Sequence, residues 1–367
     1  MTREVQVHLG ERSYAVRIGS GLLAEVGKAV AALPGVRRAV VIADSNVAAL
    51  YGRRCADSLR GAGLAADILS FSAGETHKTL ATCSRLFDSL FVLRPPVDRR
   101  SVIVALGGGV TGDVAGFVAA TALRGLRFVQ CPTTLLAAVD ASVGGKTGVD
   151  HAAGKNLIGA FHQPSGVLID VDLLKTLSPP EFANGLAECV KHAIIRDATL
   201  LDYLEQKREA ILAREPDCLT ELIARNVAIK AAVVSSDEKE TGPGQREHLN
   251  FGHTVGHAVE TFLGYGNISH GQAVSLGMVA ACRLAVARGL FESAAADRVG
   301  SVLSALGLPV RRAGLDAAKL WDIMLRDKKA RGGKVRMILP TALGAVATFE
   351  DITQDGVAQA LEAMAKG

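Results

Sequence analysis

The sequence predicts two domains, a mostly parallel α/β domain followed by a mainly helical one. Up to about residue 175, short apolar stretches alternate with segments of helical periodicity, as in a parallel sheet covered by helices on both faces. After Leu177, long helical periods replace this alternation. The chain has 367 residues, which is enough for two such domains. We therefore expect one domain over residues 1–177 and a second over residues 178–367.

The first domain opens on alternating apolar residues, Val5–Leu9 and Tyr14–Ile18, which predict a hairpin. Buried strands are then expected at 38–44, 65–71, 101–106 and 127–131, and helices near 21–32, 46–61 and 78–92. The segment 107–113, GGGVTGD, is expected to lead into a helix of small residues that ends at about 122.

In the second domain, Pro179–Glu181 resembles a helix start. Helical periodicity continues from there to about residue 234. Further helices are expected at 251–264, 270–289, 292–305 and 315–328, and a late strand pair at 334–339 and 344–349. Thr241–Gln245 reads as a flexible insert.

Composition favours a soluble, cytoplasmic enzyme. The 41 Lys and Arg exceed the 37 Asp and Glu by too few, and too evenly along the chain, to indicate nucleic-acid binding. The six cysteines lie far apart without a CxxC motif, as expected for reduced thiols. The N-terminus alternates like strands rather than like a signal peptide, and we expect no membrane partner because no uncharged window of about 18 residues occurs.

Gly107–Asp113 follows a predicted strand, opens a predicted helix and satisfies G-x-G-x-x-G. In that context helix N-terminal amides bind a pyrophosphate. The acidic residue expected about 20 residues later is absent, so we expect Asp44, at the end of an earlier strand, to hold a ribose hydroxyl. The pattern favours a dinucleotide site over a purely structural glycine turn.

Asp140–Thr147 ends in GKT but does not form a triphosphate loop. Asp140 occupies the position of the first glycine of that motif, where a carboxylate would repel phosphate. Lys146 and Lys155 nevertheless lie in glycine-rich backbone that we expect to be exposed. Two such lysines suit an anionic ligand.

Leu249–Glu260, LNFGHTVGHAVE, places His253 and His257 four residues apart on one helix face. Glu188 and His270 lie elsewhere in the same predicted domain. Two histidines and a carboxylate with one open position form the usual layout of a catalytic zinc site. The spacing leaves open which two of the three histidines accompany the glutamate.

Five segments, in order, closely resemble the 3-dehydroquinate synthase family: GGGVTGDVAGF, PTTLLAAVDASVGGKTGVDHAAGKNLIGAFHQP, GLAECVKH, LNFGHTVGHAVE and SHGQAVSLGM. The resemblance covers roughly residues 40–350. It implies a Rossmann-like NAD-binding domain, an α-helical metal- and substrate-binding domain, and a cytoplasmic homodimer. It also implies conversion of 3-deoxy-D-arabino-heptulosonate 7-phosphate into 3-dehydroquinate and phosphate, in the shikimate route to aromatic amino acids.

The resemblance implies a zinc or cobalt ion held by Glu188, His253 and His270. In the reaction it implies, the metal lowers the pKa of a substrate hydroxyl, so that hydride leaves the adjoining carbon for NAD. The new ketone acidifies the adjacent C–H, phosphate is eliminated, and NADH returns the hydride. Ring opening and an intramolecular aldol closure complete the carbocycle.

Two further sets of residues follow from the same resemblance. The NAD-binding set is Asp44, Glu75, Lys78, Gly109, Val110, Thr111, Gly112, Asp113, Thr133, Thr134, Lys146, Lys155, Leu173, Leu174, Lys175 and Thr176. The substrate-binding and catalytic set is Asp140, Lys146, Asn156, Lys191, Lys230, Arg246, Asn250, His257, the pair Lys328 and Lys329, and Arg124. The pair leaves open which lysine contacts substrate, and Arg124 is expected to reach the neighbouring subunit's phosphate site.

Three positions depart from the family pattern: Ala138 replaces a frequent glutamine, Asp150 an asparagine and Gln272 a glutamate. None is an expected ligand, but Gln272 lies beside His270 and is expected to alter its surroundings. Two extra residues around Pro243 predict a longer loop before Arg246.

Other functions fit the residues less well. A metal-dependent polyol or glycerol-phosphate dehydrogenase needs no group for a substrate carboxylate, which Lys230, Arg246 and Asn250 would bind here. A valiolone-type cyclase acts on a substrate that lacks this carboxylate. An aminodehydroquinate-type synthase is not separated from the main interpretation by one sequence. A non-catalytic metal-binding regulator is disfavoured because every expected ligand and cation is present.

Overall fold

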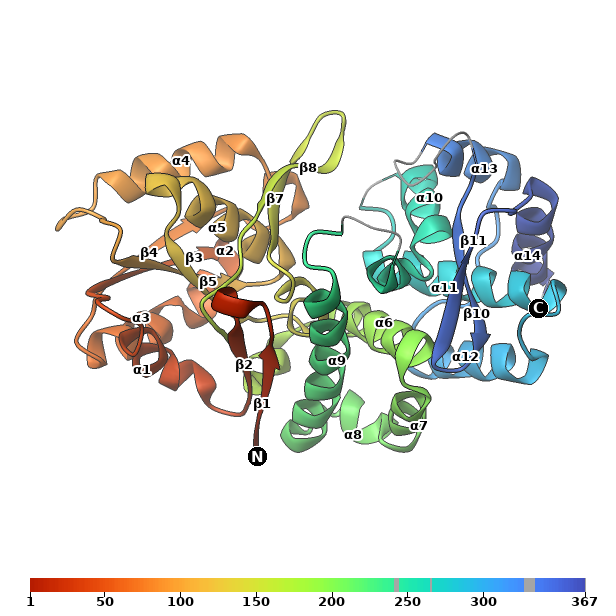
Figure 1. Cartoon of the computed structure of the whole chain (residues 1–367), viewed down its shortest axis with the longest axis horizontal. Helices are drawn as coiled ribbons and strands as arrows, with labels where there is room; N and C mark the ends of the chain where they lie inside the picture. Colours follow the sequence, from red (N-terminus) through yellow and green to blue (C-terminus); the bar gives the residue numbers. More distant parts are fainter. Residues whose placement is uncertain (241–243, 265, 327–333, 367) are drawn as a thin grey trace. The chain divides into compact units, whose positions relative to one another are not determined.

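The computed structural model describes residues 1–240, 244–264, 266–326 and 334–366. It divides into two compact units (Figure 1): Met1–Leu177 with Pro216–Lys239, and Ser178–Glu215 with Glu240–Gly367. The sequence places all of residues 178–367 in the second domain. The structure differs at 216–239, because these residues pack with the first unit.

The first unit contains a seven-stranded sheet in the order β1-β2-β9-β6-β5-β3-β4. These strands are β1 (Thr2–Val7), β2 (Tyr14–Gly19), β3 (Arg38–Asp44), β4 (Ala65–Phe71), β5 (Ser101–Gly107), β6 (Arg127–Pro132) and β9 (Val167–Asp170). β1 pairs antiparallel with β2, and the other neighbours are parallel. The predicted hairpin and mostly parallel sheet are confirmed.

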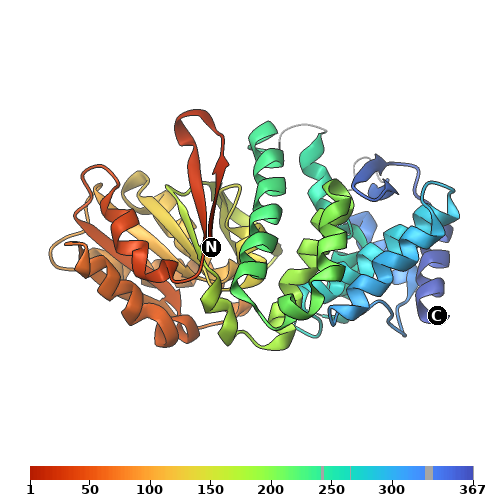
Figure 2. The same ribbon diagram turned by 90° about the horizontal axis from the view of Figure 1, so that it is seen from below.

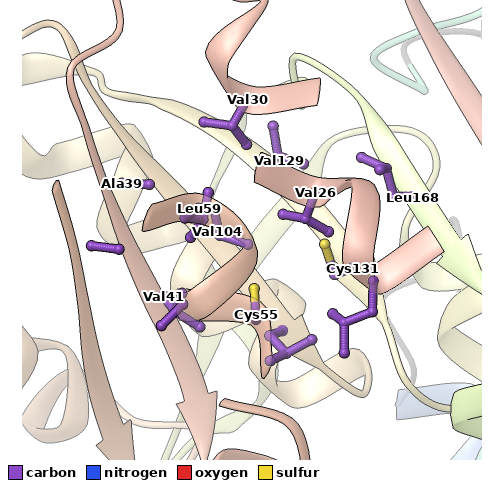
Figure 3. Close-up of a cluster of buried hydrophobic side chains, with 14 of the residues drawn as sticks. Val26, Val30, Ala39, Val41, Cys55, Leu59, Val104, Val129, Cys131 and Leu168 are labelled. Atoms are coloured by element: carbon purple, nitrogen blue, oxygen red, sulfur yellow. The ribbon is translucent and has the colours of Figure 1, made fainter. Parts of the chain in front are cut away.

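Helices cover both faces of this sheet, with α1 (Val26–Ala31) and α3 (Arg53–Gly61) on one and α4 (Leu80–Phe91) and α5 (Gly109–Thr121) on the other (Figure 1). Successive side chains of a strand point to opposite faces. Val41 of β3 therefore joins the cluster under α1 and α3, while Ile42 joins the cluster under α4 and α5. Figure 3 shows the first cluster, which also encloses the sulfur atoms of Cys55 and Cys131.

A second ribbon, β7 (Lys146–His151) and β8 (Gly154–Phe161), forms where the sequence suggests an exposed glycine-rich loop. Glycines let its two strands approach closely. A Cβ at Gly148 would lie 2.5 Å from the Ile158 carbonyl oxygen, and one at Gly159 would lie 2.2 Å from that of Thr147. The same glycines that suggest a loop in the sequence are thus required by a tight strand pair.

Helix α9 (Pro216–Ser236) packs against the β1–β2 hairpin of the first unit (Figure 2). Arg3 pairs with Glu221 at 3.0 Å, and Arg12 pairs with Glu238, just beyond the helix, at 2.7 Å. Buried apolar residues of α9 such as Val227 complete the contact. Helical periodicity predicts this helix and its buried face, but it does not say which domain that face covers.

The second unit consists of helices around one short ribbon. The helices are α6 (Pro179–Arg196), α7 (Ala198–Gln206), α8 (Arg208–Leu212), α10 (His253–Leu263), α11 (His270–Ala287), α12 (Ser293–Ala305), α13 (Ala317–Arg326) and α14 (Gln354–Lys366). β10 (Met337–Ala342) and β11 (Ala345–Phe349) form the predicted late strand pair. The mostly buried α11 contacts α6, α10, α12 and α14. Among the described helices, none has the length and apolar character that a bilayer crossing requires.

Candidate functional site

Two of the candidate histidines, His253 and His270, are the first residues of α10 and α11. α10 starts after Gly252, whose φ of 78° lies in the left-handed region that glycine adopts most easily. The two helices pack backbone to backbone, because a Cβ at Gly277 of α11 would lie 1.9 Å from the Gly252 carbonyl oxygen. This packing brings the ring centroids of His253 and His270 to 5.3 Å.

Glu188 reaches the same point from α6 and is fully buried. Its Oε1 lies 3.7 Å from Nε2 of His253 and 3.5 Å from Nε2 of His270. Zinc bonds of about 2.0–2.1 Å in a tetrahedron place neighbouring ligand atoms about 3.3 Å apart. Among the described residues, Oε1 accepts no hydrogen bond of ordinary geometry. The three groups therefore fit a divalent metal.

The protonation of Glu188 and His253 suits this fit. Burial raises the pKa of Glu188, but Lys191 and the two histidines outweigh it and hold the pKa well below its usual value. Burial lowers the pKa of His253 well below its usual value, so this ring is neutral. Its Nδ1 lies 3.1 Å from the Phe251 carbonyl oxygen and must donate, because a carbonyl only accepts. The lone pair of Nε2 then faces Glu188.

His270 lies between two carboxylates. Burial lowers its pKa, but the neighbouring carboxylates of Glu188 and Glu260 outweigh burial and raise the pKa to about 9. Without a cation, His270 is therefore protonated at neutral pH. A divalent metal bound at its Nε2 would take the place of one proton.

Of the other described candidates of the second unit, two lie on helices that carry these three residues and two lie on the segment before α10. Lys191, one turn after Glu188, is buried and its Nζ contacts Glu188 Oε2. The ring of His257 meets that of His253 edge-on, with centroids 5.2 Å apart. Arg246, which is buried, and Asn250 belong to the 3-10 helix η8 (Gln245–Asn250), which ends shortly before α10.

In the first unit, the candidate cofactor residues meet at the carboxyl ends of three adjacent strands. Thr111 Oγ1 at the start of α5 donates to Asp44 Oδ2 at the end of β3, at 3.1 Å. The backbone N–H of Thr133, after β6, donates to the Gly107 carbonyl at the end of β5. Thr134 follows directly, and a Cβ at Gly108, the N-cap of α5, would lie 3.0 Å from its methyl group. Open parallel sheets bind their ligands at this edge.

Lys78 joins this group to the β7–β8 ribbon. Its Nζ lies 2.6 Å from Asp113 Oδ2 and also donates to Asn156 Oδ1. Burial lowers the pKa of Lys78, but Asp113 and Glu75 outweigh it, so the pKa is raised. Asn156 has a φ of 55°, and its N–H donates to Asp150 Oδ1 at 2.7 Å. One residue of the expected NAD set thus holds one residue of the expected substrate set.

Two further groups from the expected sets also meet. Lys230 of α9 donates to Asp140 Oδ1 at 2.7 Å and to its backbone carbonyl, both within the first unit. Lys155 Nζ lies 3.8 Å from Glu75 Oε1. Lys146 starts β7 with an exposed side chain.

The remaining cofactor candidates of the first unit contact residues outside the two expected sets. Leu173 and Leu174 are buried, so their backbone rather than their side chains is left to meet a cofactor. Thr176 Oγ1 bonds to the Tyr51 hydroxyl at 2.7 Å, and Lys175 Nζ pairs with Asp172 at 2.7 Å.

Arg124 lies in a turn after α5 and has a φ of 65°. Lys328 and Lys329 lie outside the described residues, and so does Pro243 of the expected longer loop.

Gln272 and Glu260 both lie near the candidate metal ligands, and the sequence draws attention only to Gln272. Gln272, which is expected to alter the surroundings of His270, caps α11: its Oε1 accepts from the Ser269 N–H at 3.1 Å. The second contact of His270 comes from Glu260, whose Oε2 lies 3.7 Å from Nδ1. Glu260 is seven residues after His253 on α10, so extending the histidine pattern by one turn finds it.

Comparison with known proteins places these features in a family. Two family models, described as 3-dehydroquinate synthase N-terminal and 3-dehydroquinate synthase C-terminal, match residues 68–184 and 185–330. A 3-dehydroquinate synthase from Synechococcus sp. is 45% identical over 370 residues, covering 100% of both chains. Another, from Symbiobacterium thermophilum, is 44% identical over 361 residues, covering 98% of this chain and 99% of the relative.

Solved structures agree with this assignment. A 2-epi-5-epi-valiolone synthase from Streptomyces hygroscopicus subsp. jinggangensis 5008, with NAD+ and Zn2+ bound, has a TM-score of 0.87 and 31% identity, covering 97% of this chain and 98% of the other. A 2-deoxy-scyllo-inosose synthase, complexed with carbaglucose-6-phosphate, NAD+ and Co2+, has a TM-score of 0.86 and 27% identity, covering 99% and 100%. The chain belongs to the 3-dehydroquinate synthase family.

Proposed function

We propose that this protein is a 3-dehydroquinate synthase, which converts 3-deoxy-D-arabino-heptulosonate 7-phosphate into 3-dehydroquinate and phosphate. The activity would belong to the shikimate route to aromatic amino acids. The observation that carries the proposal is the meeting of Glu188, His253 and His270 in a chain of this family. Relatives with this name align over its full length.

Glu188, His253 and His270 would hold a zinc or cobalt ion, as the bound ions of the two related cyclases suggest. Such an ion supplies a positive charge that lowers the pKa of a substrate hydroxyl. The chain's part is to keep Glu188 ionised and to aim a neutral Nε2 of His253 at the same point.

NAD would bind at the carboxyl ends of β3, β5 and β6, and its role is to accept a hydride and later return it. The backbone amides at the start of α5 would face its pyrophosphate, and Asp44 would accept from a ribose hydroxyl. Glu75 and Lys78, on the loop after β4, would bind near the adenosine ribose.

The proposed substrate carries a phosphate and a carboxylate, which gives the local cations a purpose. Lys191, Lys230 and Arg246 are all buried. Buried cations bind anions more strongly than exposed ones because water screens them less. Asn250 and His257 would fix the substrate hydroxyls, and the imidazole of His257 would also move protons. Their shared task is to hold a flexible sugar in reactive geometry.

A phosphate-release assay on the heptulosonate phosphate tests this function. We expect phosphate release without net NADH, loss of activity on chelation, and recovery with Zn2+ or Co2+. Glu188→Ala should reduce phosphate release to background. Glu181→Ala is the matched control, because Glu181 is an exposed acid at the start of the same helix.

Net accumulation of NADH would identify a dehydrogenase instead. Phosphate release that survives full chelation would refute the metal assignment. An amino analogue of the substrate, assayed in parallel, separates the aminodehydroquinate-type reaction.

We also propose a cytoplasmic homodimer in which Arg124 completes the partner subunit's site. Support for the location comes from the six cysteines, which form no disulfide in the described chain. Mixing inactive Arg124→Ala and Glu188→Ala proteins tests the shared site. Mixed dimers contain one site with both native residues if the arginine acts across subunits, so activity should return. Failure of subunits that demonstrably exchange to regain activity would contradict this arrangement.

A further inference from the structure

We propose that Glu260 is a positioning residue of the metal centre: its carboxylate accepts the Nδ1–H of His270 and thereby turns Nε2 of that ring toward Glu188. The inference rests on the proposed function, because it takes Glu188, His253 and His270 as metal ligands.

The two ring nitrogens of His270 face two different carboxylates. Nε2 lies 3.5 Å from Glu188 Oε1, and Nδ1 lies 3.7 Å from Glu260 Oε2. A neutral imidazole carries one proton, and a carboxylate only accepts. Once a cation lies between Glu188 and Nε2, the ring proton belongs on Nδ1. The N–H formed there points at the Glu260 carboxylate, which accepts it as a hydrogen bond. Glu260 therefore selects the tautomer that binds metal through Nε2.

His253 provides an internal comparison. Its Nε2 also faces Glu188, at 3.7 Å, and its Nδ1 lies 3.1 Å from the Phe251 carbonyl oxygen. Both proposed histidine ligands thus have an oxygen facing the ring nitrogen that points away from the metal, at hydrogen-bond distance for His253 and at ion-pair distance for His270. Metal-binding histidines are generally oriented in this way, and the partner raises the basicity of the ligand nitrogen.

The surroundings of Glu260 fit a fixed orienting group rather than a solvated surface acid. The residue is 7% exposed although it carries a carboxylate, and burying such a group is costly unless it is partnered. Close packing of α10 and α11 sets its distance from His270, since a Cβ at Gly256 would lie 3.1 Å from the Ala273 carbonyl oxygen. Gln272 does not take this role, because its side chain caps α11.

The test measures metal binding by the metal-free, full-length protein without substrate. Zinc affinity is obtained by competition with a chromophoric chelator, and the ligand field from the visible spectrum of the cobalt form. Glu260→Ala should weaken zinc binding about 10–100-fold and alter the cobalt spectrum. Glu260→Gln keeps an oxygen that accepts the Nδ1–H, so it should recover most of the affinity.

Gln272→Ala is the matched control, because Gln272 lies two residues after His270 and its side chain caps the start of α11. It should lower thermal stability and leave zinc affinity and the cobalt spectrum unchanged.

Three results would overturn the inference. One is equal zinc affinity in Glu260→Ala and the native protein, and another is no recovery in Glu260→Gln. The third is two zinc ions per native chain and one in Glu260→Ala, which would make Glu260 a ligand of a second ion with His257 and His270. A native protein that binds no zinc yet releases phosphate would instead overturn the proposed metal function.

Discussion

Two clusters of polar residues in this protein are positioned by different kinds of backbone. The helical cluster, Glu188, Lys191, His253 and His270, brings ionisable groups together in the interior of the second unit, and its histidine–carboxylate distances are 3.5–3.7 Å. The strand-end cluster, Asp44, Lys78, Thr111, Asp113 and Asn156, lies at the edge of the sheet and is joined by contacts such as Lys78–Asp113 at 2.6 Å. Under the proposed function, a cation would complete the first cluster, whereas the second already has partners that it would exchange when a ligand binds.

The two clusters differ because their backbones differ. The helical cluster rests on three helices in close contact, so its donor atoms are fixed by interior packing. The strand-end cluster rests on loops after parallel strands, where Lys78 and Thr111 are buried but the side chain of Asp113 is 22% exposed. Each of the following changes acts on one cluster and is compared with a counterpart.

Removing a charge should cost most in the helical cluster. Lys191→Met leaves the fully buried Glu188 without its lysine, and breaking a buried ion pair costs about 3–5 kcal/mol. Lys78→Met should cost less, because water reaches Asp113. Urea unfolding of the metal-free variants measures both. Added zinc should restore stability to Lys191→Met alone, and equal losses at the two positions would contradict the contrast.

Helix packing is the next largest effect. Gly277→Ala forces a methyl group against the Gly252 carbonyl oxygen, and overpacking of this kind costs about 1–3 kcal/mol or more. Because it separates α10 from α11, zinc affinity should fall as well. Gly300→Ala on α12 is the control: its methyl group meets no atom within 4 Å, and we expect a gain of about 0.5–1 kcal/mol. A stable, zinc-binding Gly277→Ala would show that the helix contact does not set the ligands.

These contrasts also show what the sequence alone predicts. The buried strands β3 and β5 are long apolar runs between turn residues, so their place in a parallel sheet is readable. The β7–β8 ribbon is not, because Gly148 and Gly159 break the alternation of a strand while making close pairing possible. The local sequence pattern predicts the conformation of a segment better than it predicts which other segment it packs against.

The same limit applies to the candidate site. Spacing identifies His253 and His257 as one helix face, but the ligand choice depends on where α11 places His270. Family resemblance supplied that choice. The resemblance includes Glu260 in the segment LNFGHTVGHAVE but assigns it no role, because that role depends on a contact between two helices.

The two clusters should lose stability over different pH ranges. In the metal-free protein the pKa of His270 is about 9, above its ordinary value of 6.5. Its stabilising contribution is therefore complete below pH 6.5 and is lost as the pH rises through 9. The thermal unfolding midpoint of the native protein should decrease as the pH rises from 6.5 to 9. In His270→Ala this decrease should be absent. Lys78, with a pKa raised above 10.5, acts only at higher pH. A His270→Ala protein with an unchanged pH profile would contradict this.

The smallest effect is expected at Asp150, the position where the family resemblance leads us to expect asparagine. Asp150→Asn keeps an oxygen that accepts the Asn156 N–H, so stability should change by no more than about 0.5 kcal/mol. Asp150→Ala loses that acceptor and should cost about 1 kcal/mol. Urea unfolding measures the difference. Equal stability of the two variants would show that the Asn156–Asp150 hydrogen bond does not stabilise the β7–β8 ribbon.

The position of α9 in the chain has a consequence for synthesis. The first unit takes its sheet from residues up to 177, but its hairpin is covered by a helix that begins at Pro216. On the ribosome, the first unit therefore remains incomplete until residues 178–215 of the second unit have also emerged. A fragment ending at Leu177 would lack Lys230 and would expose the surface of β1 and β2 that α9 buries. The two units therefore cannot fold strictly one after the other during synthesis.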